Sequence, residues 1–416
     1  PEGVRDIYGS ECARKLAVQE KILQVFRLYG YEAIETPVFE YFDIFSKERG
    51  SVRAQEMYKF FDRDNNTLVL RPDMTPAVAR CVAKYFMDDD MPLRLCYLER
   101  TFKNNTSYQG YLKERAESGA ELIGDDSPDA DAEMIAMVID CLKAAGLKEF
   151  QVELGEVAFY RSLLQQSGLD EDAQAQLNDL IENKNRFGVE EFLKNQDMEE
   201  SLKEAFLKLP ELFGGINQIK KAKALTDNPQ ALAAIERLER VHTLLEEYHM
   251  ADYVSYDLGM LSRYQYYTGI IFKAYTYGTG DYIVTGGRYN KLLVQFGKDT
   301  PAVGFAIVVD QLMAALSRQQ IHIPVQLVNT VILYEPSARQ SAVRLSRFFR
   351  SEGTPVQSMV MEEGKSLEDY KGMAKKRGLR TILCLKDTGN TVTAFDMLTG
   401  NVDETPVSAY GVREIL

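Results

Sequence analysis

The feature that most constrains the fold is the stretch 160–248, whose pattern differs from that of the chain on both sides. It is rich in Leu, Glu, Gln, Asn and Lys, and its apolar residues recur at helical spacing between single glycines, a proline and a Gly-Gly pair. Segments with the alternation typical of strands come before it and return after it. This order predicts a helical insertion within a mixed, largely antiparallel α+β core.

The chain before the insertion alternates between helix and strand patterns. Residues 11–29 carry an apolar stripe and are followed by Gly30, a typical helix end. Residues 31–40 alternate like a strand and contain Pro37, which suits a strand end or a sheet edge. The remaining predictions are a hairpin at 57–62 and 67–71, a helix at 75–87, strands at 93–103 and 117–123, and a helix at 129–145.

After the insertion, strand patterns return at 252–258, 269–276, 281–286 and 302–309, and a final unit then alternates strand and helix. Its predicted elements are 330–334, 338–352, 355–361, 367–377, 381–385 and 391–396, the pattern of a small α/β domain. The segment 330–416 holds twelve basic and eleven acidic residues, so it is nearly neutral. The predicted domains are a core of 1–159 and 249–322, the insertion 160–248, and a C-terminal domain 328–416.

Charge and cysteine content narrow the classes of function. The chain has 49 Lys+Arg against 62 Asp+Glu, a net charge of −13, which argues against generic binding of nucleic acid. Five scattered cysteines without a CxxC motif suit a reducing compartment, and three histidines at unrelated spacings predict no metal site. No apolar run approaches 18 residues and the first residues lack a signal-peptide pattern, so the prediction is a cytoplasmic protein without a membrane span.

Two segments place carboxylates at predicted strand ends. Asp73 and Thr75 follow the hairpin and form an acceptor pair, but either could simply cap the helix 75–87. Glu117 and Glu121 lie four residues apart on one strand and therefore share a face. On an inner face they would repel and require a cation, and on an outer face they would only be solvated; the residues alone favour the solvated face.

Two further segments combine tyrosine with glycine. On a strand, Tyr266 and Tyr267 would face opposite ways, so one could line a pocket while the other packs in the core; core packing alone would explain the pair about as well. Gly286 and Gly287 precede Arg288-Tyr289, which allows close approach of a ligand to the backbone and fits a tight turn equally well. Neither a P-loop nor a GxGxxG after a strand is present, so the common nucleotide fingerprints are missing.

Taken together, these segments resemble the core of the class II aminoacyl-tRNA synthetases, and most closely that of histidyl-tRNA synthetase. The resemblance covers roughly 1–320, and the combination of Tyr-Tyr-Thr-Gly with Gly-Gly-Arg-Tyr is its most specific part. It implies an antiparallel sheet with the synthetase topology. The matching segments are 11–40 with its proline, 57–75, 119–121, 266–269, 286–289 and 301–306.

The chain departs from that family where ATP would be held. In the second motif Lys103 takes the place of the phosphate-binding arginine, and Asn105 takes the place of the following glutamate. Lysine lacks the bidentate fork of arginine. In the third motif Val308 replaces a glycine and Gln311 an arginine, and Ser262 occupies the position of the histidine-specific arginine, with Arg263 one residue away. The resemblance therefore implies a synthetase scaffold that does not catalyse adenylation.

A synthetase-like chain without the ATP apparatus resembles the family of regulatory subunits of ATP phosphoribosyltransferase. The segments 1–7, 71–76, 121–124 and 209–215 (Leu-Pro-Glu-Leu-Phe-Gly-Gly) agree with it. The resemblance implies a non-catalytic chain of histidine biosynthesis, without a cofactor, that forms homodimers and a hetero-octamer with four short-form catalytic subunits. It further implies activation of that subunit and a contribution to feedback inhibition by histidine, with no binding of tRNA.

The resemblance also assigns a histidine-like ligand pocket. Asp73 and Thr75 would accept from the α-amino group, and Glu121 and Tyr267 would hold the imidazole, with Tyr289 nearby. Compared with a synthetase pocket this one is more acidic, because Glu117 stands where glutamine is usual. Its clamp for the ligand carboxylate is weaker, because Lys103 and Ser262 stand where arginine is usual. Two alternatives stay open: an active histidyl-tRNA synthetase, and a synthetase-like binding protein with another partner.

Overall fold

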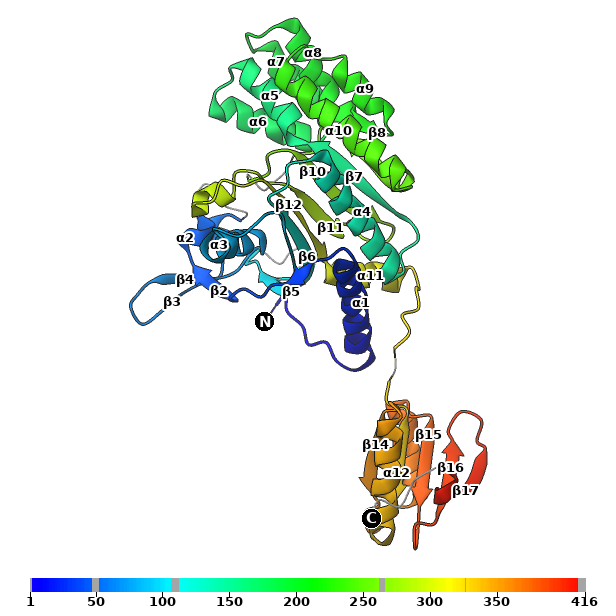
Figure 1. Cartoon of the computed structure of the whole chain (residues 1–416). Coiled ribbons are helices and arrows are strands. Elements are labelled where there is room, and N and C mark those ends of the chain that lie inside the picture. Colours follow the sequence, from blue (N-terminus) through cyan, green and yellow to red (C-terminus); the bar gives the residue numbers. More distant parts are fainter. Residues whose placement is uncertain (1, 47–51, 106–111, 262–265, 326, 411–416) are drawn as a thin grey trace. The chain divides into compact units, whose positions relative to one another are not determined.

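The computed structural model describes residues 2–46, 52–105, 112–261, 266–325 and 327–410. The chain divides into two compact units, Pro1–Ile323 and Pro324–Leu416, each of which is described by itself (Figure 1).

A nine-stranded sheet forms the centre of the first unit. Its order is β1-β5-β6-β12-β11-β10-β7-β9-β8, and its ladders are antiparallel except for β1 with β5 and β7 with β9. The strands are β1 (Glu32–Ala33), β5 (Leu93–Phe102), β6 (Glu114–Ile123), β7 (Phe150–Glu156), β8 (Phe213–Gly214), β9 (Val254–Asp257), β10 (Ile270–Thr276), β11 (Val284–Arg288) and β12 (Ala302–Val308).

The strand predicted over 31–40 is wrong as a single element. It consists of β1 and of β2 (Phe39–Tyr41), which join different sheets, and Pro37 lies between them. Proline offers no backbone N–H to a ladder, so it suits a break between strands. The predicted hairpin is confirmed as β3 (Lys59–Phe61) and β4 (Thr67–Leu70), which complete the three-stranded sheet β2-β4-β3.

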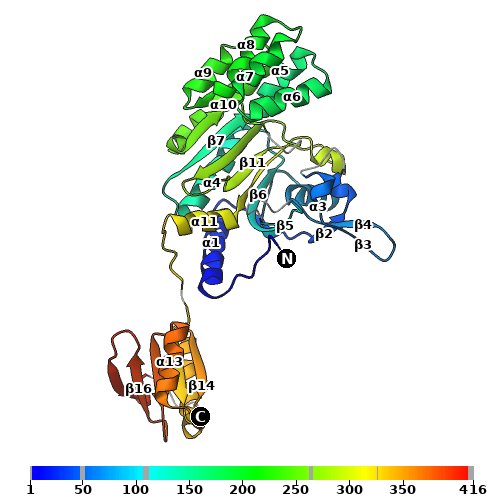
Figure 2. The same ribbon diagram turned by 180° about the vertical axis from the view of Figure 1, so that it is seen from behind.

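Helices cover one face of the large sheet. The helices α1 (Gly9–Leu28), α4 (Pro128–Ala145) and α11 (Val309–Arg318) pack on β5, β6, β11 and β12, as Figures 1 and 2 show from two sides. The rings of Phe26 in α1 and Phe305 in β12 meet at 5.9 Å between centroids, so Phe305 points to this face. The short helix α2 (Asp43–Ser46) packs on α3 (Thr75–Tyr85), which itself packs on the 3-10 helix Leu293–Phe296.

Six helices lie between β7 and β9, where the sequence predicts the insertion. Four of these six helices begin with a side-chain cap; in α10, for example, Asn228 accepts from the backbone N–H groups of Gln230 and Ala231. The last of them, α10, packs against both α5 and the core helix α4. The helices are α5 (Val157–Ser167), α6 (Glu171–Glu182), α7 (Arg186–Lys194), α8 (Glu200–Lys208), α9 (Asn217–Lys223) and α10 (Pro229–Glu247).

The second unit is a five-stranded sheet in the order β14-β13-β15-β16-β17. One apolar cluster joins Ile332 to Leu345 of α12, and another joins Val331 to Tyr370 of α13, so the two helices cover opposite faces. The strand β17 is missing from the predictions because its residues are mostly exposed and end in proline. The elements are β13 (Thr330–Tyr334), α12 (Arg339–Ser351), β14 (Val356–Val360), α13 (Leu367–Arg377), β15 (Thr381–Leu385), β16 (Thr391–Asp396) and β17 (Val402–Pro406).

Candidate functional site

The sheet face opposite α1 carries a strip of glycines beside the predicted site residues. Glu121 of β6 pairs with Gly304 of β12, and Gly304 pairs with Gly287 of β11, so the three share a face. A Cβ on Gly304 would lie 1.6 Å from Oε2 of Glu121, and one on Gly287 would lie 2.9 Å from Cδ1 of Tyr267. The glycines therefore leave room for these two side chains, and Gly287 lies within a strand rather than in a tight turn.

Glu121 is fully buried and holds two hydrogen bonds. The Thr75 hydroxyl donates to its Oε1 at 3.0 Å, and the Tyr289 hydroxyl donates to its Oε2 at 2.5 Å. Burial raises the pKa of Glu121 to about 8, and the two hydrogen bonds oppose that rise. The expectation of a solvated face for Glu117 and Glu121 is wrong, because these residues are 8% and 0% exposed.

Glu117 lies on the same face, four residues from Glu121 along β6. The Thr101 hydroxyl donates to its Oε1 at 2.8 Å. Burial raises the pKa of Glu117, while the positive charge of Lys103 lowers it, so the lysine lies close enough to act on this carboxylate. Val308 pairs with Glu117 across the β6–β12 ladder and is 3% exposed, which places its bulk beside the carboxylate.

Asp73 connects the start of α3 to the tyrosines. Its Oδ1 accepts from the backbone N–H of Thr75 at 3.2 Å, and its Oδ2 accepts from the Tyr266 hydroxyl at 3.0 Å. The helix cap itself is Met74, which makes no side-chain cap hydrogen bond. Asp73 and Thr75 therefore do more than cap the helix, since Asp73 accepts a hydrogen bond from Tyr266 and Thr75 donates one to Glu121.

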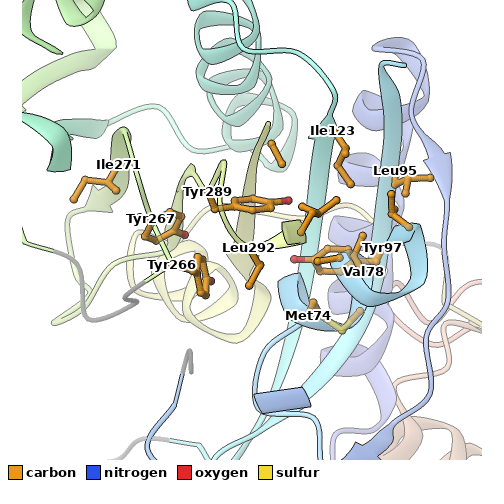
Figure 3. Packing of buried hydrophobic residues seen from close by; sticks show 14 of the residues in the cluster. Met74, Val78, Leu95, Tyr97, Ile123, Tyr266, Tyr267, Ile271, Tyr289 and Leu292 are labelled. Carbon is orange, nitrogen blue, oxygen red and sulfur yellow. The ribbon is translucent and has the colours of Figure 1, made fainter. Parts of the chain in front are cut away.

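Tyr266 and Tyr267 precede β10 and are not part of a strand, so the expectation that they face opposite ways is wrong. Their ring centroids are 4.8 Å apart, and Tyr266 also meets Tyr289 edge-on at 5.9 Å. Both are buried in one apolar cluster with Met74, as Figure 3 shows. Tyr266 was not predicted as a site residue, although the adjacent pair of tyrosines was the signal that could have identified it.

The structure thus gathers most of the predicted site into one group, the carboxylate–tyrosine cluster, and adds Tyr266 to it. Lys103 and Glu117 adjoin this cluster, and Asp73 acts on the pKa of both glutamates. Ser262 and Arg263 lie outside the described residues. The members of the cluster are Asp73, Thr75, Glu121, Tyr266, Tyr267 and Tyr289.

The cluster presents acceptors for a ligand that carries N–H groups. Its carboxylates accept hydrogen bonds from the hydroxyls of Thr75, Tyr266 and Tyr289. An amine or an imidazole of a ligand would replace these hydroxyls as the donor. Asp73 and Glu121 within the cluster and Glu117 beside it favour a ligand group that is cationic. They disfavour a carboxylate on the ligand.

Other features set limits on what this chain can hold. Among the ranges described above, no three His, Cys, Asp or Glu residues are grouped to bind a metal, and no helix is long and apolar enough to cross a membrane. A separate cavity of about 900 Å³ lies within the insertion, between α8, α9 and the start of α10. None of the predicted site residues lines it.

Comparison with known sequences gives one consistent family. The family model described as histidyl-tRNA synthetase matches residues 3–312. A relative from Acetivibrio thermocellus, named ATP phosphoribosyltransferase regulatory subunit, is 36% identical over 408 residues, which are 98% of this chain and 97% of the relative. A relative of the same name from Clostridium acetobutylicum is 40% identical over 318 residues, covering 76% of this chain and 78% of the relative.

Solved structures agree with the sequence matches. A structure described as an ATP phosphoribosyltransferase regulatory subunit/histidyl-tRNA synthetase from Bacillus halodurans has a TM-score of 0.81 at 31% identity, covering 90% of this chain and 95% of that chain. A histidyl-tRNA synthetase from Nostoc sp. PCC 7120 has a TM-score of 0.75 at 18% identity, covering 98% and 96%, which shows the fold alone. The predicted α+β fold of the class II synthetase type is confirmed. The chain belongs to the family of ATP phosphoribosyltransferase regulatory subunits, whose fold is that of histidyl-tRNA synthetase.

Proposed function

We propose that this chain binds the short-form catalytic subunit of ATP phosphoribosyltransferase and activates it, without catalysing a reaction of its own. The observation that carries this proposal is the similarity to a relative named ATP phosphoribosyltransferase regulatory subunit over 97% of its length. Lys103 and Val308, at positions where synthetases hold ATP, support a non-catalytic chain. The synthetase scaffold would then keep its ligand site but act in regulation and not in adenylation.

The proposed assembly is a hetero-octamer of four regulatory and four catalytic chains, built on homodimers of this chain. The three-stranded sheet β2-β4-β3 supports self-association. On one of its faces Phe39, Tyr41 and Phe60 are 52%, 56% and 36% exposed, and the rings of Phe39 and Phe60 meet at 5.9 Å. Exposed aromatic side chains gathered on one face are typical of surfaces that associate with another protein.

The proposed effector is histidine, held by the carboxylate–tyrosine cluster. Asp73 and Thr75 are suited to the α-amino group, and Glu121 with Tyr267 and Tyr289 to the imidazole. The acidic surroundings support weak binding, because the carboxylate of histidine would lie near Asp73, Glu117 and Glu121, and the positive charge of Lys103 already acts on Glu117. Feedback inhibition would then require histidine concentrations high enough to fill a weak site.

Mixing the purified chain with a short-form catalytic subunit tests the main proposal. We expect formation of phosphoribosyl-ATP to rise at least tenfold, and the two proteins to elute together on size exclusion, because binding favours the active state of the catalytic chain. No stimulation together with no complex would overturn the proposal. Histidine-dependent ATP–pyrophosphate exchange by the chain alone would instead favour an active histidyl-tRNA synthetase.

Calorimetric titration with histidine tests the site. We expect a dissociation constant weaker than micromolar, and about tenfold tighter binding for Glu117→Gln, since this change replaces an acidic side chain by a neutral one and leaves the positive charge of Lys103 to the histidine carboxylate. The matched control is Glu114→Gln, on the same strand but paired with Arg100 at a more exposed position. A micromolar or tighter constant for the unaltered chain would contradict the prediction of weak binding, and equal effects of the two variants would contradict the role of Glu117.

A further inference from the structure

A buried ionic cluster joins the core sheet to the helical insertion. Asp131 of α4 is fully buried and lies between two arginines. Its Oδ1 accepts from Nε of Arg288 at 2.8 Å, and its Oδ2 accepts from Nε of Arg237 at 2.8 Å. Arg288 belongs to β11 and is 2% exposed, whereas Arg237 belongs to α10 of the insertion. One carboxylate thus holds an element of the core and an element of the insertion.

Both arginines are fastened by further contacts at the start of α4. Arg288 donates from Nη1 to the carbonyl oxygen of Asp125 at 2.9 Å, and Arg237 donates from Nη2 to the carbonyl oxygen of Asp126 at 2.9 Å. Each guanidinium therefore has fixed partners on the same turn of chain. A rigid, planar donor group with several partners has few alternative positions, so displacement of either arginine disturbs Asp131.

The cluster reaches the predicted ligand site through the alternation of one strand. Gly287 faces the carboxylate–tyrosine cluster, Arg288 faces α4, and Tyr289 returns to the first face, where its hydroxyl donates to Glu121 at 2.5 Å. The backbone between these residues is also held, because the Arg288 carbonyl oxygen accepts from the backbone N–H of Thr268 at 2.7 Å. Consecutive residues therefore contact the site on one face of the sheet and the insertion, through Asp131, on the other.

We propose that the chain of contacts Glu121–Tyr289–Arg288–Asp131–Arg237 couples the carboxylate–tyrosine cluster to α10, so that a change at either end alters the other. Asp131 and Arg288 are positioning residues in this inference, since neither touches the proposed ligand. The coupling stands on the contacts alone; its use in regulation, by which an occupied site alters the insertion, rests on the proposed function.

Removing one partner from a buried charge network leaves the remaining charges partly unpaired, which costs free energy. The remaining groups shift to reduce that cost, and in the proposed coupling this shift carries the change from one end to the other. If Arg237 withdraws, Asp131 keeps a single guanidinium and Arg288 carries the whole interaction. If Tyr289 loses its hydrogen bond to Glu121, the residue next to Arg288 keeps its backbone hydrogen bonds but loses the side-chain contact that ties it to the site. A merely structural clamp would stabilise the protein as a whole, whereas coupling requires that each end respond to the other reciprocally.

Hydrogen exchange of the full-length chain, followed by mass spectrometry, tests the coupling. Arg237→Ala is expected to speed exchange of the β11 amides at least fivefold, and Tyr289→Phe to speed exchange in α10 by a similar factor. The matched control is Arg240→Ala, an exposed arginine on the same helix. Arg237→Lys keeps the positive charge but loses the planar guanidinium. Its effect on exchange of the β11 amides is expected to lie between those of Arg237→Ala and Arg240→Ala. Effects confined to the mutated end, or equal effects of Arg237→Ala and Arg240→Ala, would overturn the inference.

The exchange experiment contains neither histidine nor the catalytic subunit, so its failure is distinct from a failure of the proposed function. Thermal unfolding of each variant separates a general loss of stability from a local effect, because a general loss raises exchange throughout the core and not only in β11 and α10. The regulatory use is then tested in the complex with the catalytic subunit. Stimulation that is the same for Arg237→Ala and Arg240→Ala would overturn that use.

Discussion

Gly304→Ala is expected to lower the free energy of unfolding by about 3–5 kcal/mol. The added Cβ would lie 1.6 Å from Oε2 of Glu121 and 2.9 Å from the backbone oxygen of Ala120. Glu121 is fully buried and is held by hydroxyls of Thr75 and Tyr289, so it cannot move aside without leaving a buried carboxyl group unpaired. Chemical denaturation monitored by circular dichroism measures the change.

A matched glycine provides the control for Gly304. A Cβ on Gly215 would meet no atom within 4 Å, and the backbone of Gly215 is not left-handed, so Gly215→Ala is expected to change stability by less than about 1 kcal/mol. The double variant Gly304→Ala with Glu121→Ala identifies the cause. If the methyl group collides with Glu121, the two changes together cost less than the sum of each alone. Strict additivity would contradict the steric explanation.

Local patterns were sufficient to predict most of the elements. The hairpin before Asp73 and the helix ending at Gly146 follow from alternation, apolar spacing and glycine, all of which act within a few residues. The predicted strand over 31–40 failed because Pro37 separates two short strands whose partners lie elsewhere in the chain. Period and propensity identify a strand, but they do not identify the sheet that it joins.

In the candidate site, too, local spacing was predictable from the sequence and long-range contacts were not. The spacing of Glu117 and Glu121 predicts that they share a face, but only the ladder to β12 decides that this face is buried. Tyr289 and Glu121 are 168 residues apart, so their hydrogen bond depends on strand order and register. Tyr266 was not predicted as a site residue for a related reason. Its partner Asp73 precedes the helical insertion in the chain, and no local pattern predicts a contact over that separation.

Stability is expected to fall as pH rises from about 5 to 9, and Glu156→Gln is expected to remove the part of that fall that Glu156 causes, while the raised pKa of Glu121 leaves the rest. Glu156 is 2% exposed, and burial raises its pKa from the ordinary 4.5 to about 8. Between these two values the folded protein keeps a proton that the unfolded chain has already lost. The unfolded state then binds fewer protons, so the free energy of unfolding decreases as pH increases.

The size of the effect follows from the same shift in pKa. Glu156→Gln is expected to raise the free energy of unfolding by about 2–4 kcal/mol at pH 9, and to leave it nearly unchanged at pH 5, where the carboxyl is already neutral. Glutamine can still accept from the backbone N–H of Ala158, the contact that Oε1 of Glu156 makes at 3.0 Å. Denaturant unfolding at several pH values gives the profile of each variant.

Glu199→Gln supplies the comparison, because Glu199 is exposed at the start of α8. Both substitutions remove one negative charge from a chain of net charge −13, so general repulsion at high pH is relieved equally in each. The profile of Glu199→Gln should therefore run parallel to that of the unaltered chain, while the stability of Glu156→Gln should fall less steeply with pH. Parallel profiles for both variants would mean that Glu156 is ionised at neutral pH, and that Arg237 and Arg288, whose charges lower its pKa, outweigh its burial.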